Sequence, residues 1–306
     1  GVNLPARRVV VRDLDRYTDR GREALGVNEV RQMCGRAGRP DLDPRGEAVL
    51  VPGERDPEAV LDAYVRADPA PVTSSLASQD ALRTHVLATV ASGFADSRES
   101  LLEVLAGTFY AHAASPGGLR DVMDLVLDFL ASEGFLETAD GLVATELGDR
   151  VSRLYVDPRS AAQIRDGLRA AAERPDAGPI TVLELICRTP DLGTLYVRDP
   201  DHARLVRFAE AHDGALLGAD WADDGEYADW LAALKTACVL HEWAADVPED
   251  SIADRYGVGP GDLRATRERA QWLLSATESI AEWLGTDPSL VDELTATRRA
   301  LESREG

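Results

Sequence analysis

From residue 79 onward, apolar residues recur at the spacing of helices. The pattern predicts three successive helices, and Thr145 stands where its side chain would cap a fourth. Between the third and the fourth, two short apolar runs flank Asp140 and Gly141, which is a hairpin signal. Three helices followed by a two-stranded wing predict a winged helix over residues 76–157.

The two flanks of this region differ from each other. After residue 157 the helical pattern continues between short Gly and Pro turns, so we expect a helical bundle over residues 158–285 and a charged tail over residues 286–306. Before it, the β-branched runs RRVVVR and EAVLVP alternate with turns and a helix, which is typical of an α/β unit. A Pro- and Ser-rich stretch closes this first domain, residues 1–70. The predicted fold class is mainly α with an α/β N-terminal remnant.

The last helix of the predicted bundle has two distinct faces. At about 100° per residue, the small and apolar positions that follow Leu263 gather into one core-facing stripe. These positions are Ala270, Leu274, Thr277, Ala281 and Leu284. Trp272 and Arg264 lie on the opposite side, roughly 140° from the centre of the stripe. An exposed tryptophan indicates a covering group, either a neighbouring helix or domain or a stacked nucleobase.

The composition of the chain limits which partners its net charge can exclude. The 306 residues carry a formal net charge of -21, and Lys235 is the only lysine. An acidic, lysine-poor chain is typical of proteins that work at high salt, where screening acts over about 3 Å at 1 M. Net charge therefore does not exclude a nucleic-acid partner. The three cysteines have no metal-binding or disulfide spacing, which indicates reduced thiols, a cytoplasmic location and no metal site. No apolar run is long enough for a membrane span.

Two arginines stand three apart in a turn framed by glycines, Arg36 and Arg39 in QMCGRAGRP. With GVNLPA before this turn and DPRGEA after it, the sequence resembles motifs V and VI of superfamily 2 helicases. More narrowly, it is similar to the C-terminal part of the archaeal HelQ-type (helicase-Q-like) ATP-dependent DNA helicases. The similarity continues through LGDRVSRLYVDP, ALKTACVLHEW and DRYGVGPGDL, to about Gly285.

The resemblance implies a nucleotide site between two RecA-like domains, the second of which would end in residues 1–70. Arg36 and Arg39 would be the catalytic cations that reach the γ-phosphate, because guanidinium groups stay charged and donate in pairs. Gln32, and Gly1 and Asn3 of motif V, would line the same ATP site. The alternatives are a solvated turn for the arginines and a structural turn for GVNLPA.

The resemblance also implies two DNA contacts. The segment over residues 11–30 matches a β-hairpin that opens the duplex, so Arg12, Arg16 and Tyr17 would face nucleic acid; a solvated loop is the alternative. The last helix would lie along the single strand as part of a helical ratchet bundle, with contacts from Arg264, Arg267 and Trp272. In the family that the sequence resembles, an arginine usually stands seven residues before this tryptophan, where this chain has Ala265. The winged helix would brace the bundle rather than read DNA, since its third helix has one arginine, Arg120, against several acidic residues.

No Walker A lysine is present, because Lys235 lies in the middle of a predicted helix. The chain also opens inside a motif, so we expect a fragment that holds half of the ATP cleft, with ATP and Mg²⁺ bound mainly by a missing N-terminal part. The predicted function is that of an ATP-dependent 3′–5′ DNA helicase acting in replication-coupled repair. Its partners would be single-stranded and forked DNA and replication or repair proteins. The alternatives are an ATPase-free module that binds single-stranded DNA or a replication partner, and a superkiller-type RNA helicase.

Overall fold

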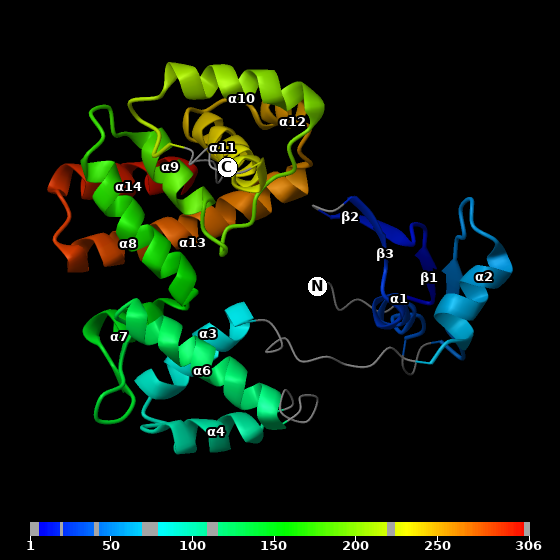
Figure 1. Ribbon diagram of the computed structural model, residues 1–306. Coiled ribbons are helices and arrows are strands. Elements are labelled where there is room, and N and C mark those ends of the chain that lie inside the picture. Colours follow the sequence, from blue (N-terminus) through cyan, green and yellow to red (C-terminus); the bar gives the residue numbers. More distant parts are fainter. Residues whose placement is uncertain are drawn as a thin grey trace. The chain divides into compact units, whose positions relative to one another are not determined.

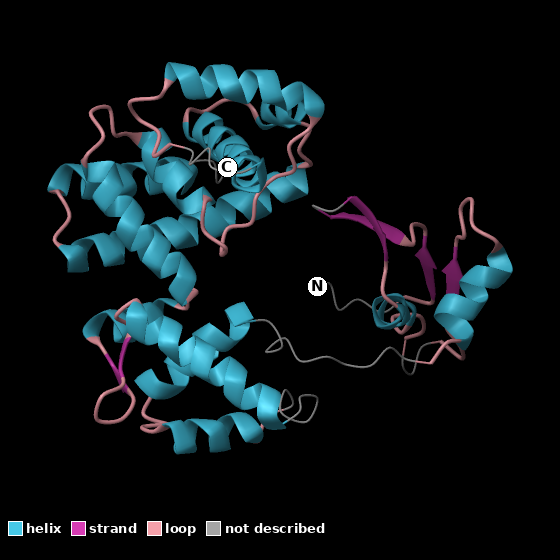
Figure 2. Cartoon of the chain, in the orientation of Figure 1, coloured by secondary structure: helices cyan, strands magenta, loops and turns pink. Residues whose placement is uncertain are grey.

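A computed structural model of the chain describes residues 6–18, 21–39, 43–68, 79–108, 116–218 and 224–302. The chain divides into two compact units, residues 1–73 and residues 74–306. Figure 2 shows strands concentrated in the first unit and helices in the second. The predicted combination of a small α/β part and a larger helical part is confirmed.

The first unit is built on a parallel strand pair. Arg8 of the first strand is in register with Glu47 of its partner, 39 residues later, and their side chains form an ion pair at 2.6 Å. Its elements are β1 (Arg8–Val11), β2 (Asp15–Thr18), β3 (Gly21–Ala24), α1 (Val27–Cys34), β4 (Glu47–Leu50), α2 (Pro57–Leu61) and the π-helical turn η1 (Asp62–Arg66). Helix α1 buries Val30 against a small core that also contains Val11 and Tyr64. The Tyr64 hydroxyl donates to the Leu25 carbonyl at 3.0 Å, which ties η1 to the end of the hairpin.

The second unit begins with the predicted winged helix. Its elements are α3 (Gln79–Ala91), α4 (Arg98–Ala106), α6 (Pro116–Ser132), β5 (Leu136–Glu137), β6 (Val143–Ala144) and α7 (Glu146–Leu154). The predicted cap is present, because the Thr145 hydroxyl accepts the Gly148 amide at 3.0 Å. Gly148 packs directly on the wing, since a Cβ there would lie 2.0 Å from the Phe135 carbonyl oxygen.

The helical bundle follows in the same unit. It consists of α8 (Pro158–Ala172), α9 (Pro179–Cys187), α10 (Asp199–Ala211), α11 (Asp224–Ala244), α12 (Glu249–Tyr256), α13 (Pro260–Leu284) and α14 (Pro288–Glu302). Figure 1 shows α13, in orange, running along the bundle. The predicted charged tail over residues 286–306 is wrong, because α14 packs on α13 and buries Leu290, Leu294 and Leu301. Arg298 of α14 adds a polar contact between the two helices, in its 2.9 Å pair with Glu278 of α13.

The winged helix and the bundle share one continuous apolar core, from Leu82 to Leu301. Polar contacts reinforce this junction. The buried guanidinium of Arg83 pairs with both carboxylate oxygens of Asp157, at 3.3 and 3.2 Å. Arg150 of α7 donates to the carbonyl and hydroxyl oxygens of Ser279 on α13, at 3.1 and 3.0 Å. The winged helix therefore braces α13 from one side.

The single lysine holds the segment that leads into α10. The side chain of Lys235 on α11 is 2% exposed, and its ammonium donates to the Tyr196 carbonyl at 2.6 Å and to the Asp201 carboxylate at 2.8 Å. Burial would raise the pKa of Asp201, but hydrogen bonds from Arg198 and Lys235 hold it well below its usual range. The pair is thus charged, buried and satisfied, and Lys235 has a structural role.

Replacing Asp201 by Asn should destabilise the second unit by about 3–5 kcal/mol, because it leaves the Lys235 charge buried without its partner. Urea unfolding followed by tryptophan fluorescence measures this unit, since all five tryptophans lie between residues 221 and 283. Arg153→Gln is the control. It breaks the exposed Arg153–Asp149 pair and should change stability by at most about 0.5 kcal/mol. Equal midpoints for the two variants would contradict this role of the buried pair.

Candidate nucleotide and nucleic-acid sites

The turn that carries Arg36 and Arg39 is fixed by the backbone. Helix α1 ends at Cys34, and the chain then turns back along the segment before β1. The Ala6 amide donates to the Arg36 carbonyl at 3.0 Å, and the Gly38 amide donates to the Ala6 carbonyl at 2.7 Å. The end of the GVNLPA segment and the glycine-framed turn, far apart in sequence, are therefore hydrogen-bonded neighbours.

Two glycines make this approach possible. Gly38 has φ +93°, a conformation that residues with a Cβ rarely adopt. Gly46 lies under the turn, where a Cβ would come within 2.3 Å of the Ala37 carbonyl carbon. The turn thus rests on main chain rather than on side chains, and the residues Arg36 and Arg39 are exposed.

The guanidinium of Arg39 is held by an acid four residues later. Nε donates to Asp43 Oδ2 at 2.7 Å, and Nη2 donates to Oδ1 at 3.0 Å. The Asp43 side chain is 6% exposed, whereas that of Arg39 is 46% exposed. The hydrogen bond from Arg39 holds the pKa of Asp43 below its usual range. Sequence reasoning assigned no role to Asp43, because an i, i+4 spacing outside a helix does not by itself bring two side chains together.

Of the other residues predicted for the nucleotide site, two are exposed and two lie outside the described residues. Gln32 is exposed in the last turn of α1, and Arg36 is exposed on the turn itself. Gly1 and Asn3 lie outside the described residues. Exposed guanidinium groups on a fixed backbone suit an anionic ligand such as a triphosphate, because they donate in pairs without losing charge.

The segment over residues 11–30 contains the expected hairpin, formed by the antiparallel strands β2 and β3, in which Tyr17 is in register with Arg22. Two of its arginines already have acidic partners. Arg12 is highly exposed and pairs with Asp13, while Arg16 pairs with Glu29 of α1 at 3.2 Å. Exposed pairs of this kind are weak, so both cations are open to competition from a phosphate backbone.

Helix α13 has the two faces that its sequence predicts. Leu263, Ala270, Leu274, Thr277 and Ala281 are buried, and Leu284 is half-buried. On the other face, the Trp272 side chain is 37% exposed. Arg264 is two turns before Trp272, is exposed, and pairs with Glu249 of α12 at 3.3 Å.

The structure places Arg267 away from this exposed face. Its guanidinium lies over the indole ring of Trp243 on α11, 5.3 Å from the ring centroid, and the residue is half-buried. This is cation–π geometry, which anchors α13 to the bundle. The predicted grouping of Arg267 with Trp272 and Arg264 is therefore not found. Helix geometry alone separates the two residues, because positions 267 and 272 point about 140° apart around a helix axis.

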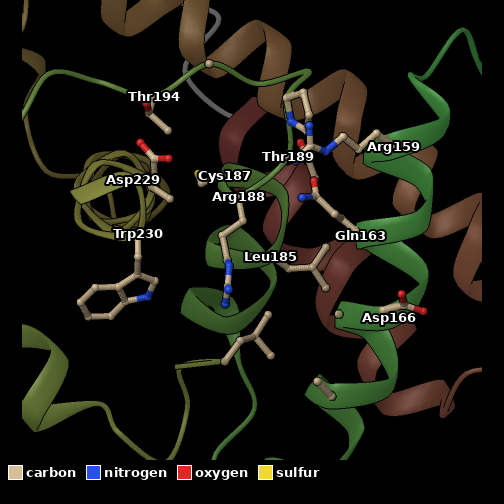
Figure 3. A pocket seen from close by; sticks show the side chains of 16 residues that line it. Arg159, Gln163, Asp166, Leu185, Cys187, Arg188, Thr189, Thr194, Asp229 and Trp230 are labelled. Carbon is tan, nitrogen blue, oxygen red and sulfur yellow. The ribbon is translucent and has the colours of Figure 1, made fainter. Parts of the chain in front are cut away.

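A separate pocket of about 720 Å³ lies in the bundle. Figure 3 shows side chains that line this pocket, among them Arg159 and Gln163 of α8 and Asp229 and Trp230 of α11. Both carboxylates and guanidinium groups line this pocket, so its charge favours neither an anionic nor a cationic ligand. Among the described residues, none of those predicted for nucleotide or DNA contacts lines this pocket.

Within the described part of the chain, no helix combines the length and apolar character needed to cross a bilayer. Nor do three or more His, Cys, Asp or Glu side chains in those residues gather in a way that could hold a metal ion.

Comparisons with known proteins identify the family of the chain. The family "Archaeal helicase, domain 4" matches residues 180–303, and a "Helix-turn-helix domain" family matches residues 46–137. The chain is 41% identical over 292 residues to "ATP-dependent DNA helicase Hel308" of Methanocella arvoryzae, which covers 93% of the chain. This chain corresponds to the C-terminal part of Hel308-type helicases.

Other Hel308 proteins give the same result. Those of Pyrococcus horikoshii and Caldivirga maquilingensis are each 34% identical to the chain, over 302 and 313 residues, and each alignment covers 97% of it. The chain spans 39%, 42% and 41% of the three relatives' own lengths, about two fifths of each. The match to the family "Archaeal helicase, domain 4" continues through α14, in agreement with the packing of that helix on α13.

Gly46→Ala should disturb the glycine-framed turn, because the added methyl group meets the backbone of Ala37 and Gly38. We expect a loss of about 1–3 kcal/mol in the first unit, typical of overpacking. Hydrogen exchange of the β1, β4 and α1 amides measures it. Gly26→Ala is the matched control, since its Cβ would meet nothing within 4 Å. Unchanged exchange in the Gly46 variant would contradict the close packing.

Proposed function

We propose that the chain is the C-terminal segment of an ATP-dependent DNA helicase that moves 3′ to 5′ on single strands and unwinds forked or branched DNA. The observation that carries the proposal is the pair of exposed arginines on a backbone-fixed turn, in a chain whose relatives are named as ATP-dependent DNA helicases. ATP is the substrate, and its hydrolysis supplies the energy for movement.

In this proposal Arg36 and Arg39 are the catalytic cations, and Gln32, Gly1 and Asn3 line the same ATP site. The arginines stabilise the charge that develops on the γ-phosphate when a cleft closes over it. Such arginines are worth roughly 10³–10⁵ in rate in other NTPases. Mg²⁺ accompanies ATP, and we assign none of its ligands to this chain.

DNA contacts are assigned to two places. Arg12, Arg16 and Tyr17 of the hairpin face the duplex junction, and the exposed face of α13 lies along the single strand. There Trp272 stacks on a base, and Arg264 exchanges Glu249 for a phosphate. The winged helix braces α13 through Arg150 rather than reading the major groove. Support for bracing comes from the hydrogen bonds of Arg150 to Ser279.

The proposal extends to domains and setting. Residues 1–70 would end the second RecA-like motor domain, residues 76–157 form the winged helix, and the ratchet bundle continues through α14. The protein would act in DNA repair in the cytoplasm of a salt-adapted archaeon, with replication or repair proteins as partners. The acidic, lysine-poor composition supports adaptation to high salt.

Neither alternative has comparable support. An ATPase-free binding module leaves the exposed arginine turn without a ligand, and a superkiller-type RNA helicase accords less well with relatives that are named as DNA helicases.

Arg39→Ala in the full-length helicase should abolish DNA-stimulated ATP hydrolysis, with a loss of roughly 10³-fold or more in kcat. Binding of single-stranded DNA should persist, because the arginine acts on phosphate in the nucleotide site. Steady-state ATPase assays and fluorescence anisotropy measure the two properties. Arg45→Ala removes another exposed arginine of the same unit and should leave turnover near that of the wild type. Wild-type turnover in the Arg39 variant would remove the catalytic role.

Trp272→Ala should weaken binding of single-stranded DNA by about 1–3 kcal/mol, which is the range for one stacked base. The 306-residue chain and a labelled oligonucleotide in an anisotropy titration suffice. Phe94→Ala removes an aromatic side chain that is more exposed, on the winged helix, and should leave the affinity unchanged. Equal affinities for the wild type and the Trp272 variant would show that this ring packs against protein instead.

A further inference from the structure

We propose that Asp43 is a positioning residue for Arg39, and that its carboxylate holds the guanidinium in the orientation from which it meets the γ-phosphate. The inference rests on the proposed function of Arg39. It adds a residue that acts through Arg39 and does not itself touch the nucleotide.

The contact leaves one edge of the guanidinium available. Asp43 takes Nε and Nη2, at 2.7 and 3.0 Å, which form the side edge of the planar group. Within the described residues, Nη1 has no hydrogen-bond partner. An arginine has five N–H donors, so it can keep both bonds to the carboxylate and still donate through Nη1 to a phosphate. The pair therefore orients Arg39 without occupying it.

Asp43 itself has little freedom to move. Its side chain is 6% exposed, and Oδ2 also accepts the Arg39 backbone amide at 3.1 Å. In the other direction, the Asp43 amide donates to the Arg39 carbonyl at 3.0 Å. A carboxylate fixed in this way restricts the rotamers of a long side chain that is otherwise half exposed. Because a misplacement of about 1 Å can reduce a catalytic rate about 100-fold, such restriction affects turnover.

Asn is the informative substitution at this position. Asp43→Asn keeps one oxygen that can accept the Arg39 amide, so the hydrogen bonds between the backbone of Arg39 and residue 43 can be retained. It removes the charge and the second acceptor, so the side edge of Arg39 is no longer held by a bidentate pair. In the full-length helicase we expect kcat for DNA-stimulated ATP hydrolysis to fall about 10-fold to 100-fold. KM for ATP should change by less than about threefold, because the interaction acts in the transition state.

Two comparisons separate positioning from a general structural effect. In the Arg39→Ala background, Asp43→Asn should cause no further loss, because a residue that acts only through Arg39 has nothing left to position. Glu47→Gln is the matched control, since Glu47 pairs with Arg8 and Arg45 of the same unit and should leave kcat unchanged. Losses that multiply in the double variant would overturn the proposal, as would wild-type turnover in Asp43→Asn alone.

A measurement on the wild-type chain tests the same proposal without any substitution. The Arg39 Nε–H should exchange with water more slowly than that of Arg45, whose side chain is 81% exposed and makes one weaker contact at 3.3 Å. Side-chain arginine NMR resolves the two, and equal exchange rates would overturn the proposal. The proposed ATPase function fails separately, if Arg39→Ala leaves turnover unchanged.

Discussion

The close approach of two backbone segments over Gly46 governs the presentation of Arg36 and Arg39. The turn is hydrogen-bonded to Ala6, and it approaches Gly46 so closely that a Cβ there would clash with the Ala37 backbone. A turn fixed in this way loses little further conformational entropy when it meets a ligand. The arginine side chains can therefore be exposed while their Cα positions remain fixed, which is the arrangement that an arginine needs if it is to meet a phosphate only when a cleft closes.

In the second unit, side chains rather than the backbone hold the proposed contact helix α13 in place. Helix α13 is buried along one face by the continuous core and is tied at the sides by Arg150 and by Arg267 over Trp243. These contacts leave Trp272 at the surface of a helix that cannot easily rotate. A rigid platform suits the proposed base stacking, because the ring would already be ordered before a strand binds. Helix α14 packs on α13 and supports it further, although the sequence predicted a charged tail in its place.

Local sequence signals predicted much of this arrangement. The buried stripe of α13 and the Thr145 cap follow from spacing within one element, so they needed no knowledge of tertiary contacts. The sequence of α14 carries the same signal, with Leu290, Leu294 and Leu301 at helical spacing, but the surrounding charges concealed it. Contacts between elements were not predictable. Arg267 lies over a ring on α11, and Asp43 pairs with Arg39 outside any helix. Neither contact follows from a local pattern.

The most direct test of the account is a structure of the full-length helicase with an ATP analogue and single-stranded DNA. We expect Nη1 of Arg39 to lie within hydrogen-bond distance of the γ-phosphate while Asp43 still holds Nε and Nη2. A nucleotide bound in the cleft with Arg39 pointing away from it, still within its own domain, would contradict the account.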